Sequence, residues 1–236
     1  MGTDEMSLEE TLKNNLESIR ARMQQACERA GSESDEVTLV AVTKTVGPEE
    51  TDTLVELGAT DIGENRVLEA IKKFEVMKQT NCRRHFIGHL QRNKARQAVE
   101  NFDFIHSVDS LRLAKELQKE ASRIGKCIPV LIQVNVATEE QKHGFDPGAV
   151  EAALEVLRGH ENLQVQGLMT MAPIVGNAEE TRPVFAGLRD LREGLIGDFP
   201  DLRHLSMGMT QDFEVAIEEG ATMVRVGSAL FEGMPE

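Results

Sequence analysis

The stretch Val37-Thr38-Leu39-Val40-Ala41-Val42-Thr43-Lys44 indicates both the fold of this chain and its chemistry. Its first seven residues are almost all apolar or β-branched, which is typical of a strand buried on both faces of a parallel sheet. Lys44 ends this strand, where side chains converge and we expect water to be scarce. A neutral primary amine in such a pocket is the nucleophile that forms a Schiff base with an aldehyde. The alternative is an ordinary solvated lysine at a strand end.

Strand-like and helix-like segments alternate from this stretch to the end of the chain. The predicted strands cover residues 37–43, 60–62, 84–87, 104–108, 128–136, 163–170, 204–207 and 222–226. The predicted helices between them cover residues 48–57, 65–77, 90–101, 110–124, 147–158, 178–196 and 211–219. Parallel strands require crossover connections, which these helices supply. The pattern predicts an α/β fold, a single (β/α)₈ TIM barrel, and a doubly wound open sheet is the alternative.

An extra amphipathic helix is predicted ahead of the first strand, over residues 7–30. Leu12 and Leu16 belong to an apolar series that recurs at steps of three and four residues, with charged residues between. We expect residues 1–6 to be disordered. The chain shows no long linker or low-complexity segment, so we expect residues 1–236 to form one domain.

The composition argues against several classes of partner. The chain has 26 Lys and Arg against 40 Asp and Glu, and the resulting net charge of −14 argues against a nucleic-acid or anionic membrane surface. No apolar run approaches the length that spans a membrane, so we expect no membrane segment. The three cysteines lack CxxC spacing, which predicts reduced thiols in a cytoplasmic protein. The chain contains no tyrosine and no tryptophan.

The carboxyl ends of the last two predicted strands indicate phosphate binding, because barrels commonly bind phosphate with the loops after strands seven and eight. Ser206, Thr210 and Ser228 offer hydroxyl groups in these loops. Gly208 and Gly227 allow backbone amides to approach an anion. The alternative for either loop alone is an ordinary turn.

Arg225 lies within the last predicted strand, on the same face as Met223 and opposite Val224. A permanently charged donor inside a barrel must have a partner. A buried ion pair with Glu64 or Asp61 is the alternative to a role in binding.

Two histidines raise the question of a metal site. His85 and His89 are four residues apart, a spacing that would suggest a metal pair on a helix. The strand pattern and Gly88 place them on different elements instead. We therefore expect no metal site here, and we expect His85 to be a core or pocket-lining residue.

These residues form motifs that resemble those of the pyridoxal phosphate homeostasis proteins (the YggS/PROSC family), which are similar to the N-terminal barrel domain of alanine racemase. The motifs are residues 41–44, 63–65, 85–94, 167–169, 205–212 and 224–227. The resemblance implies that Lys44 carries pyridoxal 5′-phosphate as an aldimine and that Arg225 faces the pyridine nitrogen. The phosphate cradle that it implies consists of Ser206, Gly208, Thr210, Gly227 and Ser228. Further pocket contacts that it implies are Asn65, His85 and Met169.

The resemblance also implies a function: a pyridoxal-phosphate-binding protein of vitamin B6 homeostasis, without robust catalytic activity, with pyridoxal-phosphate-dependent apo-enzymes as candidate recipients. An arginine at the ring nitrogen makes the ring a poorer electron sink. The related racemases use a tyrosine from a second domain as their second base, and this chain has no tyrosine. The alternatives are a pyridoxal-phosphate-dependent enzyme with weak racemase-type activity and, further from the motifs, a cofactor-free Schiff-base aldolase.

Overall fold

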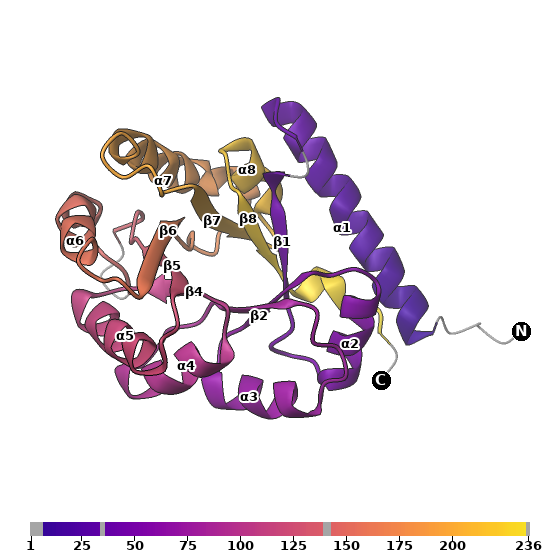
Figure 1. Cartoon of the computed structure of the whole chain (residues 1–236). Helices are drawn as coiled ribbons and strands as arrows, with labels where there is room; N and C mark the ends of the chain where they lie inside the picture. The colour runs from indigo at the N-terminus through magenta and orange to yellow at the C-terminus, as the bar shows by residue number, and fades with distance from the viewer. Residues whose placement is uncertain (1–6, 34–35, 139–142, 235–236) are drawn as a thin grey trace, which may run out of the picture.

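The strands of the molecule close into one parallel barrel in which each strand pairs with the next and β8 pairs with β1 (Figure 1). The computed structural model describes residues 7–33, 36–138 and 143–234. The strands are β1 (Thr38–Val42), β2 (Asp61–Glu64), β3 (Arg83–Phe86), β4 (Phe104–Val108), β5 (Ile128–Gln133), β6 (Leu163–Met169), β7 (His204–Met209) and β8 (Met223–Val226). The predicted TIM barrel is confirmed, and the open sheet is wrong.

The helices surround the strands, as Figure 1 shows. They are α1 (Leu8–Ala30), α2 (Pro48–Glu56), α3 (Val67–Val76), α4 (Ala95–Asn101), α5 (Leu111–Ile124), α6 (Val150–Leu157), α7 (Arg182–Leu195) and α8 (Phe213–Glu218). Short 3₁₀ turns are η2 (Arg92–Lys94), η3 (Pro147–Ala149), η4 (Ala178–Thr181) and η5 (Ser228–Leu230). The helices predicted over residues 90–101, 147–158 and 178–196 therefore contain a 3₁₀ turn ahead of a shorter α-helix.

Strand β1 is buried on both of its faces, as its apolar run predicts. Val40 pairs with Arg225 of β8, and Ala41 pairs with Ile62 of β2. Val40 and Ala41 are both fully buried. One face of the strand packs into the barrel interior and the other packs against the surrounding helices, which accounts for the absence of polar alternation.

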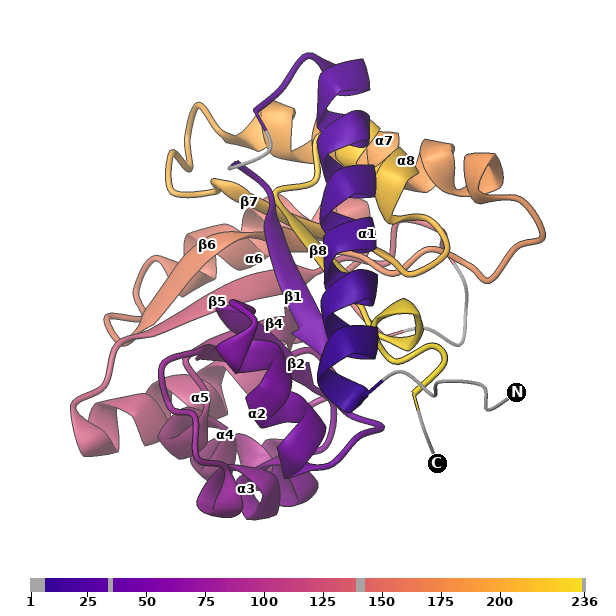
Figure 2. The same ribbon diagram turned by 90° about the vertical axis from the view of Figure 1, so that its right-hand side faces the viewer.

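The extra N-terminal helix is confirmed as α1, which runs along the outside of the barrel beside α8 (Figures 1 and 2). Ser7 and Glu10 form a capping box at its start. Leu12 and Leu16 are buried against the barrel. Residues 1–6, which we expect from the sequence to be disordered, lie outside the described residues.

The structure also bears on the cysteines and on membrane association. Cys27, Cys82 and Cys127 are all free. Burial raises the pKa of the Cys27 and Cys82 thiols, which keeps them protonated and unreactive. Among the described residues, no helix is both long enough and apolar enough to cross a membrane.

Candidate functional site

A cavity of about 800 Å³ lies at the carboxyl ends of the strands. Its volume falls within the range of about 300–1,000 Å³ that is usual for small-molecule sites. Predicted cofactor contacts that line it are Lys44, Asn65, Thr210, Arg225, Gly227 and Ser228. A smaller cavity of about 410 Å³ lies at the amino ends of β6 and β7, and none of the predicted contacts lines it.

Lys44 follows a firmly anchored strand end. The Thr43 amide donates to the Gly63 carbonyl at 3.1 Å, and its hydroxyl donates to Glu64 Oε1 at 2.7 Å. Lys73 Nζ donates to the Thr43 carbonyl at 2.7 Å and pairs with Glu64 at 2.6 Å. These contacts fix the backbone that presents Lys44 to the cavity.

The surroundings of the Lys44 side chain differ from the expected scarcity of water. Lys44 is exposed, because it lies beyond the last residue of β1 and faces an open cavity. Among the residues that the structure describes, none makes a hydrogen bond or an ion pair with its amine. The amine is therefore accessible to a ligand that enters the cavity.

Arg225 lies at the base of the cavity and is only 4% exposed. Its guanidinium donates to the Ser206 hydroxyl and, at 3.0 Å, to the Thr170 carbonyl. Burial lowers the pKa of Arg225 to about 10, and the Asp212 carboxylate opposes this shift. The guanidinium is therefore charged at neutral pH, and the two uncharged acceptors, the Ser206 hydroxyl and the Thr170 carbonyl, set its orientation.

The alternative of a buried ion pair between Arg225 and Glu64 or Asp61 is wrong. Glu64 pairs with Lys73 at 2.6 Å. Asp61 Oδ1 lies 2.7 Å from Nε of Arg83. Both carboxylates thus have cationic partners of their own, and the charge of Arg225 stays available to the cavity.

A chain of buried hydrogen bonds runs behind Arg225 through the barrel interior. Ser206 Oγ lies 2.9 Å from His106 Nδ1, and His106 Nε2 lies 2.8 Å from His85 Nδ1. His85 Nε2 lies 2.8 Å from Asp61 Oδ1. The chain therefore joins the amino end of β2 to the base of the cavity, and all of its members are buried.

One direction of donation satisfies the whole chain. Arg225 can only donate, so the Ser206 oxygen accepts from it and its hydroxyl hydrogen is free for His106 Nδ1. Burial is the largest cause that lowers the pKa of His106 well below its ordinary value, and the charge of Arg225 acts in the same direction. We therefore assign His106 as neutral, with its hydrogen on Nε2 directed at His85.

The Asp61 carboxylate ends this chain. Burial raises the pKa of Asp61, but hydrogen bonds from His85 and Thr60 outweigh that effect and hold it below its ordinary value. An ionised carboxylate accepts the Nε2 hydrogen of His85, so the tautomers of both histidines are set from this end.

Four predicted contacts do not line the cavity. Ser206 and His85 belong to the buried chain and reach the cavity through Arg225. Met169 is buried in the barrel interior. Gly208 lies against α8 and has a φ of +90°. Direct contact of these residues with a cofactor stays a prediction.

The two loops predicted to bind phosphate are brought together. The Gly227 amide donates to Thr210 Oγ1 at 3.2 Å, which joins the loop after β8 to the loop after β7. Asp212 Oδ1 accepts from the Met209 amide at 2.7 Å and closes the turn that precedes α8. A Cβ at position 227 would lie 3.3 Å from Val42 Cβ, so glycine allows the loop to approach β1 closely.

Comparison with known proteins identifies the family. Residues 14–235 match the family described as alanine racemase, N-terminal domain. Over 217 residues the chain is 44% identical to the pyridoxal phosphate homeostasis protein of Aquifex aeolicus (strain VF5), which covers 92% of this chain and 95% of that protein. This chain belongs to the pyridoxal phosphate homeostasis protein family. The relative from Escherichia coli (strain K12) is 34% identical over 230 residues, covering 93% of this chain and 95% of that protein.

Solved structures agree with this assignment. The structure of PipY of Synechococcus elongatus PCC7942 with pyridoxal phosphate bound has a TM-score of 0.81 and 37% identity, covering 93% of this chain and 99% of that chain. An alanine racemase of Clostridium difficile 630 has a TM-score of 0.75 and 16% identity, covering 96% of this chain and 57% of that chain. The latter shows a shared fold alone. The resemblance that the motifs carry is confirmed.

Several lining residues of this family member were not identified from sequence. Arg22 reaches the cavity from α1, where it pairs with Glu214 of α8 at 3.2 Å. No sequence signal marks it, because α1 lies outside the repeating barrel units. Ile174, in the loop after β6, also lines the cavity and is 91% exposed. An isoleucine in a loop is a weak signal that could have marked it.

Proposed function

We propose that this chain binds pyridoxal 5′-phosphate reversibly through the amine of Lys44 and takes part in vitamin B6 homeostasis, with residues 1–236 as one binding domain. The observation that carries the proposal is the convergence of Lys44, Arg225 and the joined loops of Thr210 and Gly227 on one cavity. The relatives named pyridoxal phosphate homeostasis proteins and the PipY structure with pyridoxal phosphate bound support it.

The donor set of the cavity fits an anionic aldehyde. Arg22, Lys44 and Arg225 line it, against the single carboxylate of Asp212 among the described lining residues. This local positive charge offsets the overall charge of −14. When bound, pyridoxal phosphate supplies an aldehyde that condenses with amines and a ring that withdraws electrons best when its nitrogen is protonated. Thr210 Oγ1 offers a hydroxyl to the phosphate.

The position of Arg225 favours binding of the cofactor without catalysis. Ser206 and Thr170 hold the guanidinium, which stays protonated at neutral pH and can only donate to a ring nitrogen. The chain also lacks a tyrosine that could act as a second base. We therefore propose a carrier without robust turnover that acts in the cytoplasm and delivers its cofactor to apo-enzymes.

The test of this proposal is the visible absorbance of the purified protein incubated with pyridoxal phosphate. We expect a band for the wild type and its loss in Lys44→Ala, because only that variant removes the cavity amine. Lys72→Ala is the matched control, since Lys72 is an exposed lysine of α3, and it should keep the band. A band of unchanged position and intensity in Lys44→Ala would show that another amine is used.

A second measurement separates the carrier from the two alternative functions. We expect L-alanine and L-serine to keep their chirality when they are incubated with the loaded protein. Sustained racemisation that Lys44→Ala abolishes would instead support a pyridoxal-phosphate-dependent enzyme. Borohydride trapping of a sugar phosphate on protein free of pyridoxal phosphate would support an aldolase.

A further inference from the structure

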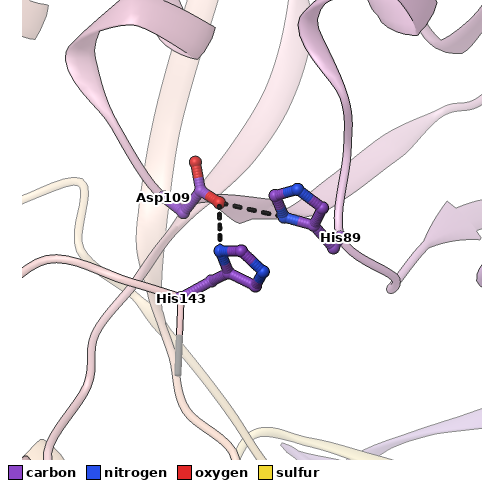
Figure 3. Close-up of side chains that lie close together, drawn as sticks. All are labelled: His89, Asp109 and His143. Carbon is purple, nitrogen blue, oxygen red and sulfur yellow. Dashed lines mark ion pairs between the residues drawn. The ribbon is translucent and has the colours of Figure 1, made fainter. Parts of the chain in front are cut away.

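A second cluster of functional side chains lies at the wall of the cavity and has no part in the proposed cofactor binding. His89, Asp109 and His143 converge there from the segments after β3, β4 and β5 (Figure 3). Asp109 Oδ2 lies 3.1 Å from His89 Nδ1 and 3.8 Å from His143 Nδ1. The two imidazole rings are stacked, with centroids 3.8 Å apart and planes inclined by 13°.

The spacing of these atoms suits a metal ion. One potential ligand atom from each residue lies within 4.8 Å of the others. Ligands at about 2.0–2.1 Å from a tetrahedral ion are about 3.3 Å apart, a separation that the two distances to Asp109 bracket. Imidazole nitrogens and a carboxylate oxygen are ligands for a cation rather than for an anion.

The carboxylate is oriented by its neighbour. Asp109 Oδ1 accepts from the Ser110 hydroxyl at 3.1 Å, which leaves Oδ2 directed at the histidines. Ser110 is itself held at the start of α5, because its Oγ accepts from the Leu113 amide at 3.3 Å. Outer hydrogen bonds of this kind orient ligands in metal sites.

The backbones that carry the two histidines are also fixed. Gly88 packs so closely on Asn65 that a Cβ there would lie 2.7 Å from Asn65 Cα, which sets the path of the chain into His89. The carbonyl of His143 accepts from Gln133 Nε2, at the end of β5, at 3.1 Å. The backbones of both histidines are therefore held in place, and their stacked rings would turn out of the stack for one nitrogen of each to face a shared ion.

We propose that His89, Asp109 and His143 bind a divalent first-row transition-metal ion, with Zn²⁺ as the expected occupant. Imidazole ligands suit this class of metal, whereas Mg²⁺ and Ca²⁺ prefer sites made of oxygen atoms. Three protein ligands leave a fourth position open, and His89 and His143 line the cavity, so this position faces it. The proposal does not depend on cofactor binding by Lys44.

Equilibrium dialysis against Zn²⁺ at neutral pH, with bound metal measured by atomic absorption, tests the site. We expect the full-length wild type and Lys44→Ala each to bind one ion per chain. Lys44→Ala is included because it removes the proposed cofactor linkage, so that bound cofactor cannot chelate the metal. His143→Ala and Asp109→Asn should weaken binding by about tenfold or more. His160→Ala is the control, because His160 is a partly exposed histidine beyond α6 that does not line this cavity, and the variant should bind as the wild type does.

Two results would overturn the proposal: no Zn²⁺ bound by the wild type at millimolar concentration, or unchanged affinity in His143→Ala and Asp109→Asn. Binding of Co²⁺ can be measured on the wild type alone, so this test does not require that the variants fold. Tetrahedral Co²⁺ absorbs in the visible range, and we expect these bands to appear on addition and to disappear when Zn²⁺ displaces it. Their absence would also contradict the site.

Discussion

At the scale of single residues, Gly208 sets the path of the chain from β7 to α8. Its φ of +90° is a conformation that residues with a side chain rarely adopt. A Cβ there would also lie 2.5 Å from Ala216 Cβ and 2.9 Å from Phe213 Cα. The close approach of α8 to the strand end, and hence the position of the loop that carries Thr210, requires glycine.

Gly208→Ala should therefore lower the free energy of unfolding by about 1–3 kcal/mol, through strain and overpacking. Urea denaturation measures this change. Gly194→Ala is the control, because Gly194 lies in α7 and a Cβ there would contact nothing within 4 Å. That variant should gain about 0.5–1 kcal/mol from helix propensity. Equal effects of the two variants would contradict the role assigned to Gly208.

At the scale of elements, α1 contributes to the site although it is not one of the barrel units. It packs on α8, and Asn15 Nδ2 donates to the carbonyl of Leu230 at 3.0 Å, which ties it to the segment after β8. Arg22 extends from α1 to the cavity. Burial of its apolar side is thus expected to support both stability and the shape of the site.

Leu16→Ala should lower the free energy of unfolding by about 2–4 kcal/mol, because Leu16 is 1% exposed and truncation leaves a cavity. Urea denaturation compares it with Glu17→Ala, which changes the exposed side of the same helix and should alter stability by about 0.5 kcal/mol at most. A Leu16→Ala variant as stable as Glu17→Ala would show that α1 packs only weakly on the barrel.

At the scale of the whole molecule, the buried chain from Asp61 to Arg225 makes stability depend on pH. His106 is held neutral in the folded protein, since its pKa lies well below the ordinary value, whereas the unfolded chain binds a proton near pH 6.5. The unfolded state therefore binds more protons as pH falls, and the free energy of unfolding decreases. Burial also lowers the pKa of His204, which acts in the same direction.

We expect the free energy of unfolding to fall by about 1 kcal/mol from this one group between about pH 6.5 and 5.5. Urea denaturation across this range measures the slope, which His106→Gln should reduce. His160→Ala, which removes a partly exposed histidine, should leave the slope unchanged. Because the pKa of Asp61 is lowered in the folded protein, its carboxylate stabilises the fold above the ordinary carboxyl pKa. That stabilisation is lost only below about pH 4, outside this pH range. An unaltered slope in His106→Gln would contradict the assignment.

The boundaries of the elements show where sequence patterns lose precision. The apolar run after residue 128 continues to Val136, but β5 ends at Gln133; Val134 still donates its amide to the Met169 carbonyl of β6 and forms an isolated bridge with Phe145. In the other direction, β7 extends to Met209, two residues further than predicted, with an irregular register against β8. Both differences arise from pairing with distant segments, which local hydrophobicity does not encode.

The sequence by itself determined the barrel and the strand ends at which Lys44, Arg225 and Gly227 lie. The reason is that the periodicity of side chains predicts the strands and helices, the turn residues mark their ends, and both signals are local in the chain. Only the tertiary structure decided which side chains meet. It placed His106 between Ser206 and His85, and it brought His89, Asp109 and His143 together. The physical reason is that closure of the barrel sets the register between strands, and contacts across it depend on that register and on helix packing rather than on any short stretch of chain.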